Sequence, residues 1–348
     1  MGNSAIYLRN SEGKEWLIQI KYCRTGCELY QPSAWRGKLV VRMLPVLAKF
    51  PLPFFRTVQL NAFIPENVLQ FIQEIFGDEC NCSAFMGTPG THKKATIQVS
   101  RRNEICGYVK YSRDPAITTL FEAEQKKLAW LREKGVPNVP ECMALRVLED
   151  STEVFVQSTQ KQLDSKIEHE FGDMQKQFLD SLYEMTKVPL RFEYTDFFKT
   201  IQYVRHYIQN TDIFHKKEHG IVEQAIQSIL DAYSNRIVEF CVCHRDFTPW
   251  NTCVTGNTLF VFDWEYAQKT YPRGIDQCHF LIQTKKFEQH LSMDRIAKDI
   301  KESNYYGLGK LVFLAYCLDY AAIYMQRNKA DDLDKVKEAI HLLGYIES

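Results

Sequence analysis

Three polar residues in the second half of the chain have types and spacing that suit work on phosphate groups. In "CVCHRDFTPWNTCV" (residues 241–254), Asn251 follows Asp246 by five residues, and Asp263 lies seventeen residues after Asp246. Carboxylate and amide oxygens are hard ligands that suit Mg²⁺, a cation that also binds phosphate oxygens. A second carboxylate a few ångströms away can accept a proton from an attacking hydroxyl. These groups together make a minimal site for in-line phosphoryl transfer.

The segments around these residues predict short strands that hold the polar cluster in place. "RIVEFCVC" predicts an apolar strand that ends where the cluster begins. "NTCV" and "LFVFDWE" predict two further strands joined by a "TGNT" turn. Pairing of these two strands would bring Asn251 close to Asp263, with Asp246 across a loop from both.

The same residues carry a resemblance to known families. "HRDFTPWN" followed by "VFDWEYA" resembles the catalytic loop and metal motif of kinases. The chain has Asp-Trp-Glu where protein kinases have Asp-Phe-Gly, and Thr248 where serine/threonine kinases place a lysine. "DFTPWN" and Asp-Trp-Glu are similar to the aminoglycoside phosphotransferase and choline kinase superfamily, and "DWEYA" is similar to its choline/ethanolamine kinase branch. Arg245 departs from the Gly or Asn usual in those families.

This resemblance implies a role for each residue of the cluster. Asp246 would orient or deprotonate the attacking hydroxyl, and His244 would mainly brace the loop. Asn251 and Asp263 would hold Mg²⁺. Asp276, in "YPRGIDQCHFL", matches a later aspartate of the family. It either braces the metal loop or caps the next helix, and the sequence leaves both readings open.

The resemblance also implies an ATP site further upstream. "FMGTPGTHKKATIQV" contains Gly87 and Gly90, where backbone N–H groups could approach phosphates. Lys110, late in the strand-like "ICGYVKYS", is the candidate for the α- and β-phosphates. Glu124 on the following helix is its candidate partner, and Glu122 is the competing choice. In the strand "EVFVQST", the backbone around Val156 and Gln157 would read the adenine.

The order of predicted elements indicates an α+β chain with two lobes. Residues 1–80 predict an α/β extension that lies outside the resemblance and is interpreted as a structural addition. Residues 81–159 predict a small β-rich N-lobe with one main helix. Residues 160–348 predict a larger, mostly helical C-lobe that holds the catalytic and metal loops. The resemblance implies a protein-kinase-like fold for the two lobes.

The composition of the chain indicates which binding partners and which cellular compartment to expect. The 348 residues include 43 Lys+Arg and 43 Asp+Glu, so no overall charge favours nucleic-acid binding. The 11 cysteines lack zinc-site spacing, which favours reduced thiols in a cytoplasmic protein. The apolar "LGKLVFLAYCLDYAAIYM" carries Lys310 and Asp319, so it predicts a buried helix and not a transmembrane segment.

Three functions fit these observations to different degrees. The first is an ATP- and Mg²⁺-dependent phosphotransferase that moves the γ-phosphate to a hydroxyl of a small molecule, such as a sugar, an amino alcohol or an aminoglycoside-like compound. The alternative is a pseudokinase or nucleotide-binding regulatory module of the same fold. A protein kinase is disfavoured, because "DWEYAQKTYPRGIDQ" leaves little room for an activation segment. The sequence does not identify a protein partner. Tyr194, Asp196, Tyr316, Asp319 and Tyr320 are the aromatic and acidic residues that could bind the acceptor, and core packing is the expected role for most of them.

Overall fold

The computed structural model describes residues 4–11, 13–30, 35–48, 55–87, 94–327 and 332–347. The chain forms two compact units. The N-terminal unit comprises Met1–Glu133, Pro137–Lys166 and Val254–Phe260, and the C-terminal unit comprises Lys134–Val136, Ile167–Cys253 and Val261–Ser348.

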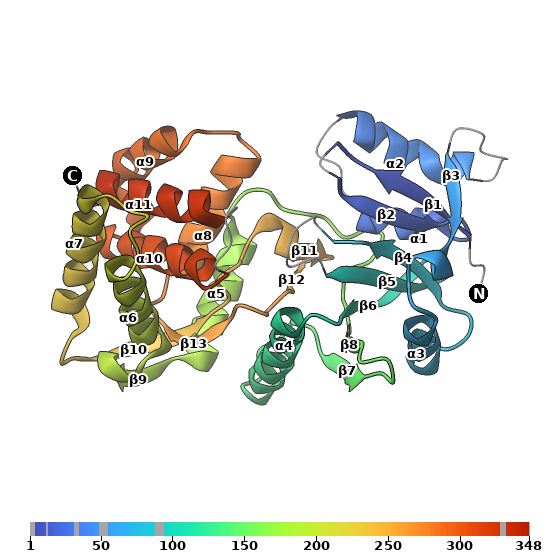
Figure 1. The fold of residues 1–348 in the computed structure, drawn as a ribbon, viewed down its shortest axis with the longest axis horizontal. Coiled ribbons are helices and arrows are strands. Elements are labelled where there is room, and N and C mark those ends of the chain that lie inside the picture. The colour runs from blue at the N-terminus through green and yellow to red at the C-terminus, as the bar shows by residue number, and fades with distance from the viewer. Residues whose placement is uncertain are drawn as a thin grey trace. The chain divides into compact units, whose positions relative to one another are not determined.

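The N-terminal unit is built on one eight-stranded sheet with the order β3-β1-β2-β4-β5-β6-β8-β7 (Figure 1). Its strands are β1 (Ser4–Arg9), β2 (Glu15–Gln19), β3 (Arg56–Gln59), β4 (Asn81–Phe85), β5 (Ala95–Arg101), β6 (Glu104–Ser112), β7 (Cys142–Val147) and β8 (Glu153–Gln157). Every neighbouring pair is antiparallel. The unit's helices are α1 (Cys23–Gly26), α2 (Trp35–Leu47), α3 (Glu66–Phe76) and α4 (Pro115–Glu133).

The first 80 residues share this sheet and do not form a sheet of their own. Strand β2 pairs with β4, so that Trp16 lies opposite Phe85 and Leu17 opposite Ala84. One apolar core contains Leu17 and Ile72 from the extension together with Val109 from β6. The sequence-based boundary near residue 80 therefore falls inside a continuous sheet and a shared core.

The C-terminal unit is mainly helical. Its helices are α5 (Asp173–Thr186), α6 (Asp196–Gln209), α7 (Lys216–Tyr233), α8 (Ile275–Phe287), α9 (Met293–Glu302), α10 (Lys310–Arg327) and α11 (Leu333–Glu347). A small sheet has the order β13-β10-β9, with β9 (Val188–Arg191), β10 (Ile237–Cys243) and β13 (Gln268–Tyr271). A separate hairpin of β11 (Thr252–Thr255) and β12 (Thr258–Val261) belongs mostly to the N-terminal unit, which contains Val254–Phe260. Antiparallel strands in the N-terminal region and helices in the C-terminal region confirm the predicted α+β class.

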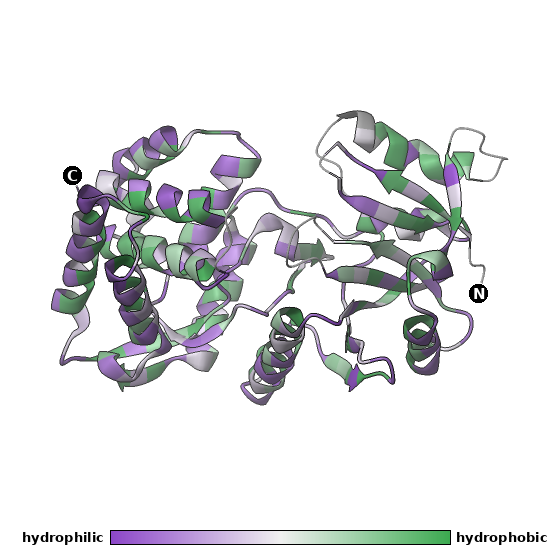
Figure 2. Ribbon diagram, in the orientation of Figure 1, coloured by the Kyte–Doolittle hydropathy of each residue, from purple (hydrophilic) through white to green (hydrophobic). Residues whose placement is uncertain are grey.

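Helix α10 is the central helix of this unit and packs against α6, α7, α8 and α11. Its residues from Phe313 to Ile323 are all buried. The outer helices carry hydrophobic residues on one side and hydrophilic residues on the other, as α7 and α9 show in Figure 2. None of the helices within the described ranges has the length and apolar character needed to cross a membrane.

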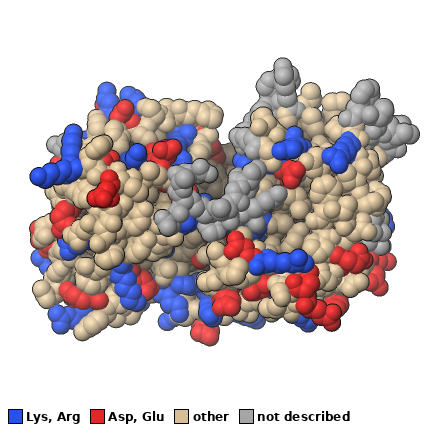
Figure 3. Space-filling view, in the orientation of Figure 1, with Lys and Arg blue, Asp and Glu red and all other residues tan. Residues whose placement is uncertain are grey.

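Charged side chains of both signs lie on the face of the molecule drawn in Figure 3. Figure 3 shows basic and acidic side chains interspersed on the visible face of each unit. All 11 cysteines are free thiols, and most of them are buried.

Candidate active site

Asp246 and Asn251 are brought together by the loop of residues 244–251, which follows β10 and ends in a 3₁₀ turn (Pro249–Asn251). The Nδ2 of Asn251 donates to the backbone oxygen of Asp246 at 2.9 Å and to its Oδ2 at 2.8 Å. Because the amide nitrogen is engaged in this way, the amide oxygen of Asn251 is the group left to face a cation. The side chain of Asn251 can therefore support the carboxylate of Asp246 through its nitrogen and offer its oxygen to a cation.

His244 braces this loop from the interior. It is fully buried, its Nδ1 accepts from the backbone N–H of Asp246 at 3.3 Å, and its Nε2 donates to the backbone oxygen of Phe262 at 3.0 Å. Its ring also packs on Trp264 at 4.5 Å between centroids. His244 therefore connects the 244–251 loop to the segment that carries Asp263.

Asp263 directly follows Phe262, the residue whose backbone oxygen accepts the hydrogen bond from His244. The backbone N–H of Phe262 donates to the backbone oxygen of Asn251 at 3.0 Å, which sets Asp263 beside the end of the loop. Asp263 has a φ of 68°, a left-handed conformation that is uncommon for a residue with a side chain. Such strain persists only where the surroundings impose it, and it is frequent at functional sites. The donor set of one amide oxygen and one carboxylate fits Mg²⁺.

Asp276 accepts three hydrogen bonds from the chain leading into the loop. Its Oδ2 accepts from the N–H of His244 at 2.8 Å, and its Oδ1 accepts from the N–H of Arg245 at 2.9 Å and from the Sγ of Cys243 at 3.2 Å. Burial and the charge of Asp276 raise the pKa of the Cys243 thiol well above its usual value. Asp276 lies in the first turn of α8, but its carboxylate braces the 244–251 loop. Neither sequence-based reading, a metal-loop brace or a helix cap, described that contact.

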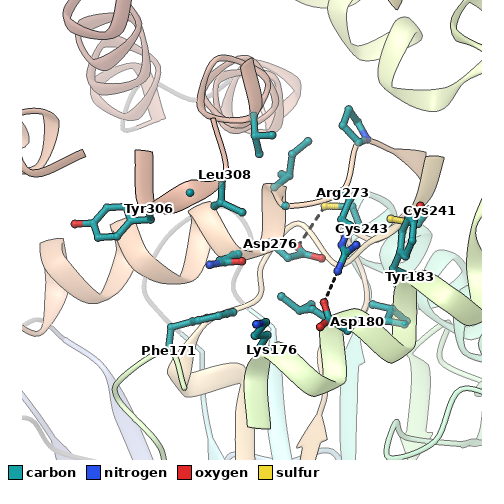
Figure 4. Close-up of a pocket in the computed structure, with 18 of the residues that line it drawn as sticks. Phe171, Lys176, Asp180, Tyr183, Cys241, Cys243, Arg273, Asp276, Tyr306 and Leu308 are labelled. Carbon is teal, nitrogen blue, oxygen red and sulfur yellow. Dashed lines mark hydrogen bonds and ion pairs between the residues drawn. The ribbon is translucent and has the colours of Figure 1, made fainter. Parts of the chain in front are cut away.

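A cavity of 610 Å³ is lined by residues of α5, of β10 and of the start of α8, where Asp276 lies (Figure 4). Asp180 of α5 forms an ion pair with Arg273 at this cavity, with Oδ1 and Nη2 2.5 Å apart. Cys243 and Asp276, joined by their hydrogen bond, form part of its wall. Asp246 is not among the residues that line it.

His279 is a residue of this site that the sequence analysis missed. Its Nε2 lies 3.2 Å from Oδ1 of Asp246, and only 5% of the residue is exposed. The rings of Tyr316 and Tyr320, both on α10, lie 5.7 and 6.0 Å from its ring. One signal was present: His279 follows Asp276 by three residues, so the two share a helix face.

The predicted acceptor residues do not gather in one place. Tyr316 and Tyr320 lie beside His279, whereas Tyr194 is 70% exposed. Asp196 accepts hydrogen bonds from the Thr270 hydroxyl and the Lys269 N–H, and so ties α6 to β13. Asp319 is buried in an ion pair with Arg245. Asp319 therefore has a structural role in place of the acceptor-binding role considered from the sequence.

In the N-terminal unit, Lys110 and Glu124 form a buried ion pair. The Nζ of Lys110 lies 2.7 Å from Oε2 of Glu124, and their side chains are 5% and 0% exposed. Glu124 reaches this position because it lies on the buried face of α4, about one turn from Phe121 on one side and Leu128 on the other. Glu122, the competing choice, is on the exposed face and pairs with Lys126.

The other predicted nucleotide-binding residues lie around the same sheet. Gly87, just after β4, has a φ of 83°, a conformation that favours glycine. Gly90 lies outside the described residues. Val156 and Gln157 belong to β8, which is paired with β6 on one side and β7 on the other. The backbone groups of these two residues are therefore engaged by strands on both sides.

Comparisons with known proteins agree with this arrangement. Residues 111–273 match the sequence pattern of the phosphotransferase enzyme family. The apo form of a thermostable mutant of aminoglycoside phosphotransferase APH(4)-Ia is similar, with a TM-score of 0.52 and 12% identity over 80% of this chain and 97% of that one. A ternary complex of a thermostable APH(4)-Ia mutant with ADP and hygromycin B gives a TM-score of 0.50 and 10% identity, again over 80% and 97%. No curated protein matches the chain.

At these identities the structural likeness establishes the fold, and the family pattern covers the segment from the end of β6 to Arg273. That segment includes Glu124, the 244–251 loop and Asp263. The resemblance noted in the sequence is thereby confirmed: residues 111–273 carry the pattern of the phosphotransferase enzyme family, and the chain has the protein-kinase-like fold of the aminoglycoside phosphotransferases.

Proposed function

We propose that the protein is an ATP- and Mg²⁺-dependent phosphotransferase that moves the γ-phosphate to a hydroxyl of a small molecule. The observation that carries the proposal is the set Asp246, Asn251 and Asp263. Asn251 bonds Asp246 through its amide nitrogen, and a backbone bond from Phe262 keeps Asp263 beside Asn251. This arrangement offers a proton acceptor and two oxygen ligands on adjoining segments of one unit.

In this reaction Asp246 accepts the proton of the acceptor hydroxyl as the oxygen attacks phosphorus. Asn251 orients that carboxylate, and its amide oxygen and Asp263 hold the cation. Bound Mg²⁺ would neutralise charge on the phosphate oxygens. Lys110, paired with Glu124, would bind the nucleotide phosphates. The ternary complex of the APH(4)-Ia mutant contains ADP, which supports use of a nucleotide by this fold.

We place the acceptor beside a row of three tyrosines on α10. Tyr316, Tyr320 and Tyr324 follow at four-residue spacing, with ring centroids 5.7 and 4.8 Å apart. Burial raises the pKa of Tyr324, and the nearby charge of Asp246 contributes in the same direction. Tyr316 and Tyr320 are buried, so the half-buried ring of Tyr324 is the aromatic face left to meet an alcohol that carries a cationic or sugar group. We therefore favour an amino alcohol, a sugar or an aminoglycoside-like acceptor in the cytoplasm.

The test is release of ADP from ATP and Mg²⁺ with a panel of these three acceptor classes. Wild-type protein is compared with Asp246→Asn and Asp263→Asn, and with Asp180→Asn as the matched control, because Asp180 pairs with Arg273 away from the site. Acceptor-dependent turnover lost in the first two variants and kept in the third supports the proposal. Nucleotide binding, seen as a thermal shift, without turnover for any acceptor would support the pseudokinase alternative.

A further inference from the structure

We propose that His279 is a positioning residue that fixes the carboxylate of Asp246 for proton transfer; this inference rests on the proposed function. Its basis is the contact between the imidazole Nε2 and Oδ1 of Asp246 at 3.2 Å. The imidazole comes from α8, thirty-three residues further along the chain. A buried histidine therefore contacts the carboxylate that we propose as the proton acceptor.

The two oxygens of Asp246 are held from two different elements. Asn251, in the 3₁₀ turn, donates to Oδ2 at 2.8 Å, and His279, in α8, lies at hydrogen-bond distance from Oδ1. Rotation of the carboxylate would break both bonds at once. Each oxygen has two lone pairs, so each can still accept one further hydrogen bond. The carboxylate is therefore fixed in orientation and remains able to take the proton of the acceptor hydroxyl.

His279 is itself held rigidly. Tyr316 and Tyr320 of α10 flank its ring, and 5% of the residue is exposed. One helical turn earlier, Asp276 accepts from the backbone N–H groups of His244 and Arg245. Helix α8 thus holds the 244–251 loop at two points. Asp276 binds the backbone of the loop, and His279 contacts the side chain of Asp246. A support that is fixed in this way can keep a catalytic group within the narrow tolerance that proton transfer requires.

A positioning role makes a different prediction from a role as the proton acceptor. Glutamine can place an amide N–H near the position of the imidazole Nε2–H, but it cannot serve as a base. Asparagine has the same amide on a side chain one methylene shorter, so it cannot reach Asp246. The variants His279→Gln and His279→Asn therefore differ in the length of the side chain but have the same polarity and the same hydrogen-bonding group. His279→Phe removes the donor and keeps a ring.

The experiment measures kcat and the KM for ATP and acceptor in the full chain. We expect His279→Gln to keep kcat within about threefold, and His279→Asn and His279→Phe to lose about 10- to 100-fold, with the KM for ATP unchanged. In an Asp246→Asn background, His279→Phe should not lower the residual turnover any further, because the carboxylate that it positions is already gone. His169→Gln serves as a control, since His169 is exposed and pairs with Glu288.

Equal kcat for His279→Gln and His279→Asn would overturn the positioning role, whether both are active or both inactive. Thermal unfolding of each variant shows whether a loss of kcat reflects loss of the fold. If Asp246→Asn is inactive while all His279 variants are active, the proposed function stands and this inference fails. If Asp246→Asn is as active as wild type, the proposed function itself fails.

Discussion

The guanidinium of Arg245 lies against the carboxylate of Asp319 inside the C-terminal unit, with Nη2 2.7 Å and Nε 2.8 Å from Oδ1. Both side chains are 3% exposed. Burial lowers the pKa of Arg245, but the charge and hydrogen bond of Asp319 together with the neighbouring Tyr271 outweigh it, so the pKa is raised and the guanidinium stays charged. Arg245 thus anchors the 244–251 loop to α10. Its presence gives the chain a structural ion pair, and it is not a sign of protein-kinase function.

Removal of one member of this pair should destabilise the protein strongly. We expect Arg245→Ala or Asp319→Asn to lower the free energy of unfolding by about 3–5 kcal/mol, because the partner is left buried without its charge complement. Denaturant unfolding measures this change. The double variant Arg245→Met/Asp319→Leu removes both charges and should recover most of the loss. A double variant as unstable as the single ones would contradict this account.

Activity should depend on a divalent cation through Asn251 and Asp263. Chelation of Mg²⁺ should abolish turnover, and added Mg²⁺ should restore it. Asp263→Asn should lower kcat by roughly a hundredfold or more at saturating ATP, because a charged ligand is replaced by a neutral one. Titration of Mg²⁺ against ADP release checks this, and turnover that is insensitive to chelation would argue against the assignment.

The Lys110–Glu124 pair should control nucleotide binding. In Glu124→Gln the buried ammonium of Lys110 loses its charged partner, and we expect the KM for ATP to rise by about tenfold and the fold to be less stable. Glu122→Gln is the matched control two residues away, on the exposed face. It should change neither quantity measurably, because exposed ion pairs contribute little. Similar effects of the two variants would show that the buried pair has no special role.

Tyr111 should make stability fall at alkaline pH. Burial raises the pKa of its phenol from 10.0 to about 12 in the folded protein. The folded state then holds the proton more tightly than the unfolded state does, so this contribution is complete below pH 10 and is lost as the pH rises to about 12. Denaturant unfolding at a series of pH values should show a shallower fall for Tyr111→Phe than for wild type. Parallel curves would contradict the assignment.

The loop and its neighbours were predictable because their geometry is local. Asp246 and Asn251 are five residues apart, and a short hairpin returns the chain to Asp263. Lys110 and Glu124 lie on a strand and the helix that follows it, so their pairing also follows from adjacent elements. For contacts of this kind, residue types and spacing carry most of the information.

The distant contacts were not predictable in this way. Helical spacing identifies the buried face of α8 or α10, but not which residue of another element that face meets. His279 and Asp319 were therefore missed as partners of Asp246 and Arg245. The pairing of β2 with β4 was missed for a similar reason, since helices α1, α2 and α3 and the edge strand β3 separate them along the chain.

The strand order of the large sheet has a consequence for synthesis of the protein. Strands β2, β4, β5 and β6 lie next to one another in the order in which they leave the ribosome. Each of the later three can pair at once with a strand already made, so no long stretch of unpaired strand edge must wait for a distant partner. Strand β2 would then act as the template on which the next strands of this sheet are assembled. A chain that began at β4 would have to start this sheet without that template and would leave one edge of β4 open to self-association.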